Sequence, residues 1–186
     1  MVKRLLDIGL ALLLLPLAVA LCLPAAVAIR LETSGTPLFR QERVGLGQTS
    51  FVLWKLRSMS KGTRTLGSHE VDARAVTRVG RVIRRLKIDE LPQIWNVLRG
   101  DMSFVGPRPC LPIQSDLIAE REARGVFAAR PGITGLAQLR GIDMSTPRRL
   151  AQADAEYLQS RSLSGDIRLI LGTFAVRGRG DAARQG

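Results

Sequence analysis

Aromatic residues make up only 4% of this 186-residue chain, which argues against the stacking platforms that bind single-stranded nucleic acid. There are two cysteines: Cys22 lies in an apolar run and Cys110 in a polar segment. They offer no disulfide framework, so we expect reduced thiols in a cytosol-facing protein. The only histidine, His69, has no cysteine or carboxylate constellation nearby. It is expected to be a solvated loop residue rather than a base or metal ligand.

Positive charge is abundant. Lys and Arg number 28 against 16 Asp and Glu, a formal net charge of +12. Such an excess needs an anionic partner: nucleic acid, an anionic membrane surface or phosphorylated substrates. The length suits one domain with a real core.

Residues 8–29 form a run of 22 residues without a charged side chain. As a straight helix, at about 1.5 Å per residue, the run is long enough to span a bilayer. A signal peptide is less favoured, because the run exceeds a usual signal core and no clean cleavage site follows it. The sequence therefore predicts membrane insertion.

Two features favour a re-entrant helix over a span. Pro16 and Pro24 interrupt the run, and each removes a backbone hydrogen bond and bends or breaks a helix. Basic residues flank both ends, and a re-entrant segment would keep both flanks in the cytoplasm, as the positive-inside preference requires.

The remainder shows no repeat or linker. We expect short strands at 36–43 and 51–57, the second with half-buried alternation, and a loop at 58–68. Helices are predicted at 79–86, 89–98, 119–129, 147–160 and 167–176. The last is apolar on most sides, which suits a membrane-interface helix or a buried core helix.

The helix at 89–98 is the most informative. Proline is tolerated only in the first turn of a helix, so Pro92 predicts that the helix starts near Asp89, a good capping residue. Gly100 is well placed to end it.

Asp89 and Glu90 are adjacent acids among many bases. Alone, such a pair is more often a helix cap with a favourable dipole contact than an active site. Arg84 precedes the pair and Arg108 follows it in a Gly-Pro-Arg-Pro loop. Arginines and helix N-termini both suit phosphate oxygens. An ionised carboxylate there can attack phosphorus or hold Mg²⁺ against a diphosphate, so the pattern permits phosphoryl transfer.

The string KIDELPQIWNVLRGDMSFVGPRP at residues 87–109 closely resembles the core of the bacterial sugar transferase family, the small monotopic phosphoglycosyl transferases. Further matching pieces occur in order along nearly the whole chain: Lys3-Arg4 with Asp7, FRQERVG at 39–45, KLRSM at 55–59 and RPGITG at 130–135. A lone acidic pair is weak evidence, whereas this ordered series is specific.

The resemblance implies a reaction. A sugar 1-phosphate would pass from a nucleotide diphosphate sugar, usually a UDP-sugar, to undecaprenyl phosphate. By the same likeness Asp89 is the nucleophile that forms a covalent sugar-phosphate enzyme, and Glu90 helps to bind Mg²⁺ with Asp89 close to the same ion. The runner-up mechanism is direct transfer in a ternary complex, with Asp89 acting only as a metal ligand.

The resemblance also implies binding residues. Arg84 and Arg108 occupy the family's phosphate-contacting positions, and Arg57 stands where many members carry lysine. Asp154 matches an active-site acid with a supporting role, although an ordinary helix-surface charge is an equal alternative. The family's membrane helix breaks at a Ser-Pro pair, where this chain carries Val19 and Ala20.

We therefore expect one α/β domain, predominantly helical. Residues 1–30 would form a re-entrant membrane helix, and 31–186 a catalytic domain on the cytoplasmic face of the bacterial inner membrane, with interfacial helices that meet anionic lipids. The chain resembles the minimal catalytic form of the family. The rival readings are a non-catalytic basic membrane adaptor of a glycan assembly complex and a nucleic-acid-binding protein. The apolar run and the scarcity of aromatic residues argue against nucleic acid.

Overall fold

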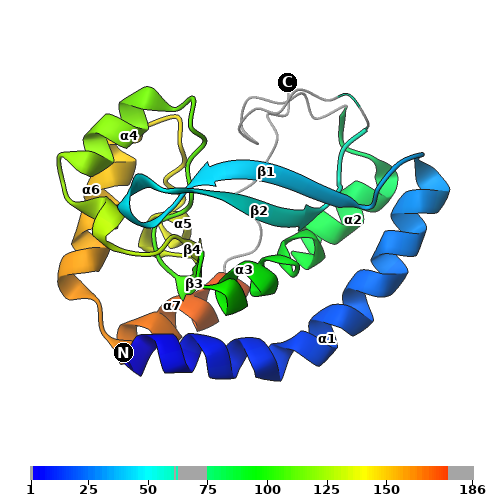
Figure 1. Ribbon diagram of the computed structural model, residues 1–186, viewed down its shortest axis with the longest axis horizontal. Helices are drawn as coiled ribbons and strands as arrows, with labels where there is room; N and C mark the ends of the chain where they lie inside the picture. The colour runs from blue at the N-terminus through cyan, green and yellow to red at the C-terminus, as the bar shows by residue number, and fades with distance from the viewer. Residues whose placement is uncertain (1, 61, 63–74, 176–186) are drawn as a thin grey trace.

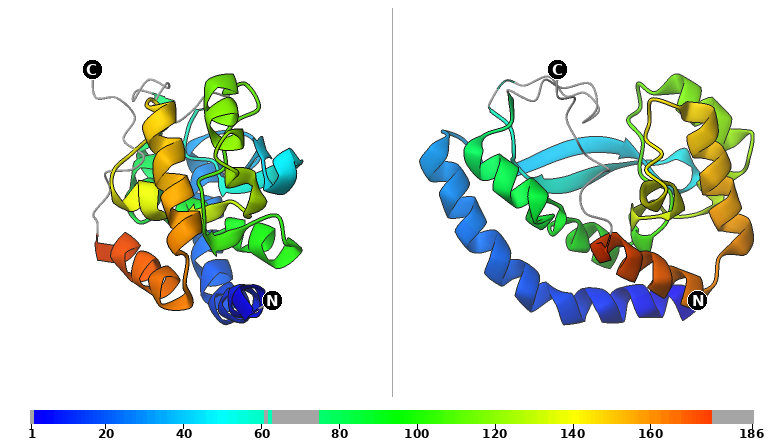
Figure 2. Two further views of the ribbon diagram at one scale, coloured as in Figure 1. Left: turned by 90° about the vertical axis from the view of Figure 1, so that its left-hand side faces the viewer. Right: turned by 180° about the vertical axis from the view of Figure 1, so that it is seen from behind.

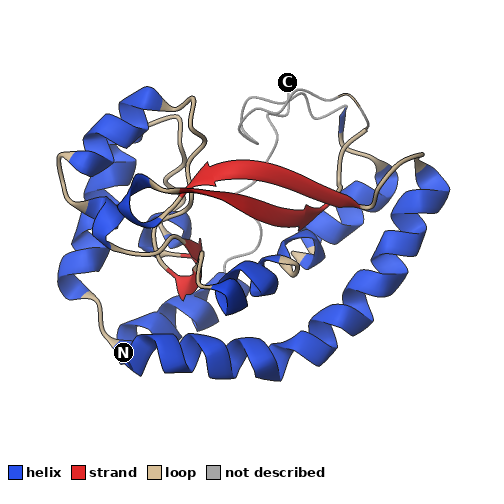
Figure 3. Cartoon of the chain, viewed as in Figure 1, coloured by secondary structure: helices blue, strands red, loops and turns tan. Residues whose placement is uncertain are grey.

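The computed structural model describes residues 2–60, 62 and 75–175, so His69 and most of the expected 58–68 loop lie outside the described residues. Helices predominate around two short strand pairs (Figures 1 and 3). The predicted class, a mostly helical α/β domain, is confirmed.

Helix α1, Val2–Glu32, is continuous through Pro16 and Pro24. It changes direction along its length and curves around one side of the domain (Figures 1 and 2). The missing amide hydrogen bonds of two prolines account for such bending. Among the described residues, α1 alone is long and apolar enough to cross a membrane, and little of it is buried against the rest of the chain. A core helix of a soluble protein would be mostly buried.

One face of α1 packs on the domain, and it is built from small side chains. Ala11, Ala18 and Ala25 are buried at seven-residue spacing, which aligns them on one side of a helix. The main core cluster lies between this face, strand β2 and helix α3. It contains Ala11, Ala18, Leu53, Ile94, Val97 and Met102.

The two strands predicted at 36–43 and 51–57 are β1, Leu38–Val44, and β2, Ser50–Leu56, and they pair as an antiparallel hairpin. The 3₁₀ turn η1, Leu46–Gln48, joins them, with Gly47 at a φ of 59°. The expected alternation in β2 is wrong: Leu53 and Leu56 are buried while Val52 is exposed. A two-stranded ribbon twists strongly, so the face turned toward the core changes along its length.

Helix α2, Arg78–Arg85, follows the hairpin. Thr77 accepts a hydrogen bond from the Gly80 amide at its N-terminus, and the Glu32 carboxylate at the end of α1 accepts from the Arg78 and Val79 amides. The end of α1 therefore satisfies first-turn amides of α2, which have no partner within their own helix.

The start predicted for the next helix is wrong. Helix α3 is Gln93–Arg99, with Pro92 at its N-cap position, and Asp89 lies in a separate 3₁₀ turn, η3, Ile88–Glu90. Lys87, in a left-handed conformation with φ of 59°, separates η3 from α2. Pro92 therefore precedes the first helical turn instead of lying within it. The termination at Gly100, with φ of 94°, is as predicted.

Two strands that the sequence analysis missed, β3, Ser103–Val105, and β4, Gly132–Thr134, pair in parallel. They are three residues each, too short to show a period. Helix α4 is Ser115–Glu122 rather than 119–129, because the chain turns at Gly125, which has a φ of 66°. A 3₁₀ turn, η4, Val126–Ala128, follows.

The chain closes with three helices: α5, Leu136–Leu139; α6, Pro147–Ser160, as predicted; and α7, Leu163–Ala175, which begins four residues earlier than expected. Helix α7 lies beside the N-terminal half of α1 in all views (Figures 1 and 2).

Polar contacts fasten the start of α1 to the domain. Arg4 donates to the Val97 and Leu98 carbonyls at the end of α3, the latter at 3.0 Å. A guanidinium there satisfies orphan carbonyls and complements the negative end of the helix dipole. The buried Asp7 carboxylate accepts from the Ser103 hydroxyl at 3.0 Å and the Phe104 amide at 3.1 Å, which ties α1 to β3.

A second set of contacts ties α1 to α6 and α7. Lys3 pairs with Asp166 at 2.6 Å, and Asp166 also accepts the Tyr157 hydroxyl at 2.8 Å. Burial and this hydrogen bond to Asp166 raise the pKa of Tyr157 well above its usual range, so the hydroxyl stays a donor.

Candidate active site

Asp89 and Glu90 lie in the η3 turn between α2 and α3, and both side chains are buried, with 5% and 8% of their surface exposed. Left-handed Lys87 makes the sharp turn that brings them back toward the hairpin. Adjacent buried carboxylates are costly unless cations or hydrogen bonds compensate them.

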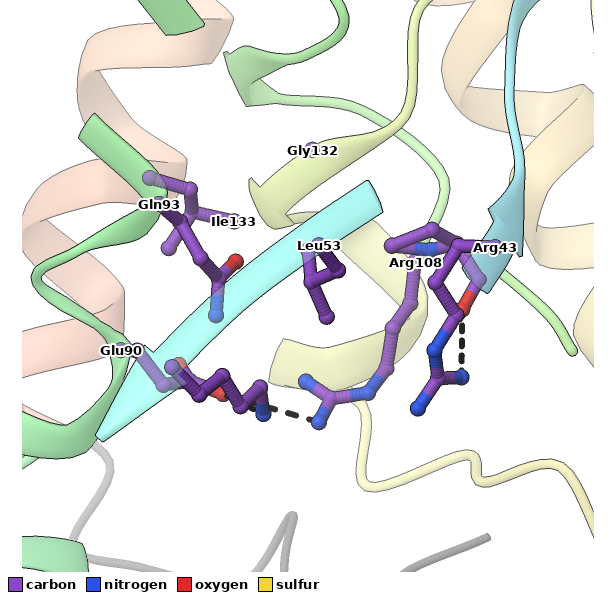
Figure 4. A pocket seen from close by; sticks show the side chains of 9 residues that line it. Arg43, Leu53, Glu90, Gln93, Arg108, Gly132 and Ile133 are labelled. Atoms are coloured by element: carbon purple, nitrogen blue, oxygen red, sulfur yellow. Dashed lines mark hydrogen bonds and ion pairs between the residues drawn. The ribbon is translucent and has the colours of Figure 1, made fainter. Parts of the chain in front are cut away.

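Two cations compensate Glu90. Its Oε1 lies 3.0 Å from Nζ of Lys55 on β2 and 3.6 Å from Nη2 of Arg108 in the loop after β3. Three elements far apart in sequence thus meet at one carboxylate (Figure 4). They line a small, shallow pocket. Its lining residues are Arg43, Leu53, Lys55, Glu90, Gln93, Arg108, Pro109, Gly132 and Ile133.

The loop that carries Arg108 packs backbone to backbone against β4. The Gly106 amide donates to the Thr134 carbonyl and the Gly132 amide to the Pro107 carbonyl, each at 2.9 Å. A Cβ on Gly132 would fall 2.1 Å from the Gly106 nitrogen, so only glycine fits. This explains physically why a Gly-Pro-Arg-Pro loop and a Pro-Gly segment occur together.

Arg43 forms the wall beside Arg108. Its Nη1 donates to the Pro109 carbonyl at 3.0 Å, and its Nη2 donates to Oε1 of Gln41 at 2.5 Å. The Val44 amide also donates to the Cys110 carbonyl at 3.0 Å. The end of β1 is therefore joined to the residues that follow Arg108.

Sequence analysis missed Lys55 and Arg43 as pocket residues. Both lie within strings that were recognised, KLRSM and FRQERVG. Lys55 lies on a strand whose burial does not alternate, so no sequence pattern indicated that its side chain lines the pocket. Nothing in the pattern around Arg43 distinguishes it from the exposed Arg40 on the same strand.

Arg84 and Arg57, the other predicted phosphate-binding arginines, lie outside this lining. Arg84 is half-buried in the last turn of α2, just before the η3 turn. Arg57 donates to the Thr33 and Ser34 carbonyls beyond the end of α1, at 3.0 and 2.7 Å. The structure thus gives Arg57 a role in holding the chain that follows α1, and its phosphate-binding role stays a prediction.

Asp154 is also not a lining residue. It lies on α6, 2% exposed, and Oδ2 accepts two hydrogen bonds from Arg121 of α4, at 2.7 and 3.0 Å. The alternative of an ordinary helix-surface charge is wrong, since both partners are buried. Burial raises the pKa of Asp154, and the Arg121 guanidinium opposes that shift. This ion pair joins α4 to α6.

Asp89 and Glu90 suit Mg²⁺ better than a metal that needs a complete protein cage. No cluster of three or more histidine, cysteine or acidic residues gathers within the described part of the chain. Mg²⁺ commonly takes one or two carboxylates and completes its shell with water and substrate phosphates. Two neighbouring carboxylates beside a cationic pocket fit that requirement.

Comparison with known proteins settles the family. The family model described as bacterial sugar transferase matches residues 1–180. The chain belongs to the bacterial sugar transferase family. A relative from Caulobacter vibrioides, named UDP-glucose:undecaprenyl-phosphate glucose-1-phosphate transferase, is 46% identical over 92% of this chain and 67% of its own length.

Two other relatives differ in how much of their own length this chain covers. This sugar transferase is 39% identical to the UDP-N-acetylgalactosamine-undecaprenyl-phosphate N-acetylgalactosaminephosphotransferase of Aeromonas hydrophila, over 98% of this chain but 45% of the relative. It is 37% identical to an uncharacterised sugar transferase, EpsL, of Bacillus subtilis, over 90% of this chain and 83% of the relative. The chain thus spans less than half of the Aeromonas protein and most of the Bacillus one, and the named sugars differ between relatives.

Proposed function

We propose that this chain transfers a sugar 1-phosphate from a UDP-sugar to undecaprenyl phosphate, with Asp89 as the nucleophile. The observation that carries the proposal is the cationic pocket lined by Glu90, the direct neighbour of Asp89 in the η3 turn, in a chain with a helix that is apolar enough to insert in a membrane. Relatives that bear this activity in their names match almost the whole chain.

The first half-reaction is a displacement at phosphorus. A carboxylate oxygen of Asp89 attacks the β-phosphorus of the UDP-sugar and forms an oxygen–phosphorus bond. The bond from that phosphorus to the bridging oxygen breaks, and UMP leaves with the electron pair. No proton need move, because nucleophile and leaving group are both oxyanions.

The second half-reaction regenerates the carboxylate. A phosphate oxygen of the lipid attacks the same phosphorus, the bond to Asp89 breaks, and a polyprenyl diphosphate sugar is released. Lys55 and Arg108 lie where they can neutralise phosphate oxygens in both steps, and Arg108 can do so with two parallel hydrogen bonds. Their contact with Glu90 keeps both cations directed at the pocket.

Mg²⁺ is the proposed cofactor, held by Asp89 and Glu90. When bound, it would neutralise diphosphate charge and polarise the phosphorus centre. Glu90 is already paired with Lys55 and Arg108, so these cations compete with the ion for its carboxylate. Arg84, half-buried just before the pair, is proposed to contact the phosphates as well.

The membrane arrangement follows from exposed apolar side chains. Helix α7 exposes Leu163, Ile167 and Leu171 at four-residue spacing, one face of a helix. Val82 on α2 and Leu86, which directly follows α2, are exposed at the same spacing. We infer that these faces rest in the headgroup region, that α1 is re-entrant, and that the basic excess holds anionic lipids on the cytoplasmic face. The soluble donor and lipid acceptor would then meet at headgroup level.

The test is retention of label without acceptor. Purified protein is incubated with UDP-sugars that carry ³²P at the β-phosphate, with Mg²⁺ and without lipid. We expect stoichiometric label on wild type and none on Asp89→Asn, which keeps the shape of the side chain. Asp116→Asn, an exposed acid in the first turn of α4, is the matched control and should label normally.

The alternatives give other results. If full activity required both substrates together and no label were ever retained, direct transfer in a ternary complex would replace the covalent scheme. If no UDP-sugar were consumed at all in the presence of lipid and Mg²⁺, the transferase assignment itself would fail.

A further inference from the structure

Arg108 lies between two anchored points of its loop. On one side the Gly106 and Pro107 backbone bonds to β4, and on the other the Pro109 carbonyl accepts from Arg43. The two prolines restrict the backbone further, because proline fixes its own φ and keeps the residue before it extended. The position of the Arg108 side chain therefore depends mainly on how the loop is held on either side of it, at β4 and at Arg43.

Arg43 is unusual among the arginines of the hairpin. Only 7% of its surface is exposed, and its guanidinium donates to the Pro109 carbonyl and to the Gln41 side chain. Burying a guanidinium is costly, and these hydrogen bonds offset part of that cost. A buried arginine with this geometry fixes the position of a loop; it does not act as a surface charge (Figure 4).

The contact that Arg43 supports is sensitive to small shifts. Nη2 of Arg108 lies 3.6 Å from Oε1 of Glu90, near the outer limit of an ion pair. A displacement of Pro109 by a few tenths of an ångström would move Arg108 along with it. The directional part of an arginine interaction weakens steeply once its distance and angle leave the favourable range.

We propose that Arg43 is a positioning residue of the transferase reaction, which holds the Pro109 carbonyl so that Arg108 faces Glu90 and the donor phosphates. Gln41 helps to hold Arg43 in this position, because its side-chain oxygen accepts a hydrogen bond from the second guanidinium nitrogen. The inference rests on the proposed function, since it concerns the same pocket.

A double-mutant cycle tests it. Arg43→Lys keeps the charge and most of the volume but cannot hold both acceptors with planar geometry. In the wild-type background we expect kcat/KM for the UDP-sugar to fall about ten-fold, with the same division between KM and kcat as Arg108→Ala. In the Arg108→Ala background the same substitution should change kcat/KM by less than about two-fold. Arg140→Gln, at an exposed pair with Glu156, is the control that removes a remote arginine and should leave both parameters unchanged.

Gln41→Met gives a second approach if Arg43→Lys does not fold. This substitution removes one acceptor of the Arg43 guanidinium while Arg43 itself is unchanged. We therefore expect a smaller loss of kcat/KM, divided between KM and kcat in the same way. The loss should again be absent in the Arg108→Ala background. Thermal unfolding of each variant is measured in parallel.

Additive losses in the Arg108→Ala background would overturn the proposal, because Arg43 would then act directly on substrate. A loss that accompanies a lowered unfolding temperature, with a division between KM and kcat unlike that of Arg108→Ala, would also overturn it, as a purely structural role. Each outcome presupposes an active wild type, so failure of the proposed function is seen separately as absent UMP release.

Discussion

The buried acids of this chain differ in what surrounds them. Glu90 meets Lys55 and Arg108 at the edge of a pocket, where both cations keep some exposure. Asp154 meets a single arginine, Arg121, and both side chains are almost completely enclosed, at 3% and 2% exposure. Cations that remain partly exposed can turn to a ligand, whereas an enclosed pair can only hold two helices together.

This contrast predicts the behaviour of Asp154→Asn. The substitution leaves the Arg121 charge buried without its counterion, which typically costs about 3–5 kcal/mol of stability. We therefore expect a large drop in the thermal unfolding midpoint, while the molecules that remain folded keep the wild-type KM for the UDP-sugar. Glu156→Gln, at the exposed Arg140–Glu156 pair, should leave the unfolding midpoint almost unchanged. Unchanged stability with a raised KM would instead assign Asp154 to substrate binding, as the family resemblance implies.

At the scale of elements, periodic segments were predictable and short ones were not. The β1–β2 hairpin, helix α6 and the long apolar helix all carry enough residues for a pattern to appear. The parallel pair β3–β4 depends on the contact between Gly106 and Gly132, which only tertiary packing reveals. The start of α3 was misplaced because Pro92 is compatible with either side of the helix boundary.

The residues of the candidate site that lie within one sequence motif were predictable, and those from distant segments were not. Asp89, Glu90 and Arg108 lie within one continuous motif, and the structure brings Glu90 and Arg108 together. Lys55 comes from a strand more than thirty residues earlier, so its contact with Glu90 required the fold.

The fastening of α1 to β3 leads to a prediction for Asp7. In Asp7→Ala, the Ser103 hydroxyl and the Phe104 amide lose their acceptor, and each buried unsatisfied donor costs about 1–3 kcal/mol. We expect a clearly lower unfolding midpoint in detergent micelles and earlier proteolysis near β3. Lys3→Ala is the matched control, because Lys3 pairs with Asp166 from a partly exposed position and Asp166 keeps Tyr157. If Asp7→Ala and Lys3→Ala unfolded alike, the contact with β3 would be no more important than a surface ion pair.

At the scale of the whole molecule, α1 contacts the rest of the domain at both of its ends. Its N-terminal end is fixed to α3, β3 and α7 by Arg4, Asp7 and Lys3, and its C-terminal end caps α2 through Glu32. Both ends are thus bound to the same domain, and Ala18 in the middle packs in its core, so α1 follows the domain along its length (Figure 1). A straight span with its ends on opposite membrane faces would have to break one set of these contacts.

The topology prediction is that both ends of α1 lie on the same membrane face. Single cysteines are introduced at Val2 and Leu31, which are 59% and 84% exposed, in a Cys22→Ala background. Native Cys110 can stay, because it is fully buried and burial raises the pKa of its thiol, which keeps it unreactive. With a membrane-impermeant maleimide, we expect Val2→Cys and Leu31→Cys to react in inverted membrane vesicles and not in right-side-out vesicles.

Asp116→Cys, an exposed position of the catalytic domain, reports the face on which that domain lies and should follow the same pattern. Labelling of Val2→Cys from the face opposite to Leu31→Cys would show a true span. That result would require the contacts of Lys3, Arg4 and Asp7 with the domain to be absent in the membrane, so the Asp7→Ala variant would then be as stable as wild type. A shared face together with a destabilised Asp7→Ala variant is the combination that re-entry requires, because the same polar contacts that hold α1 on the domain also forbid its first turn from crossing the bilayer.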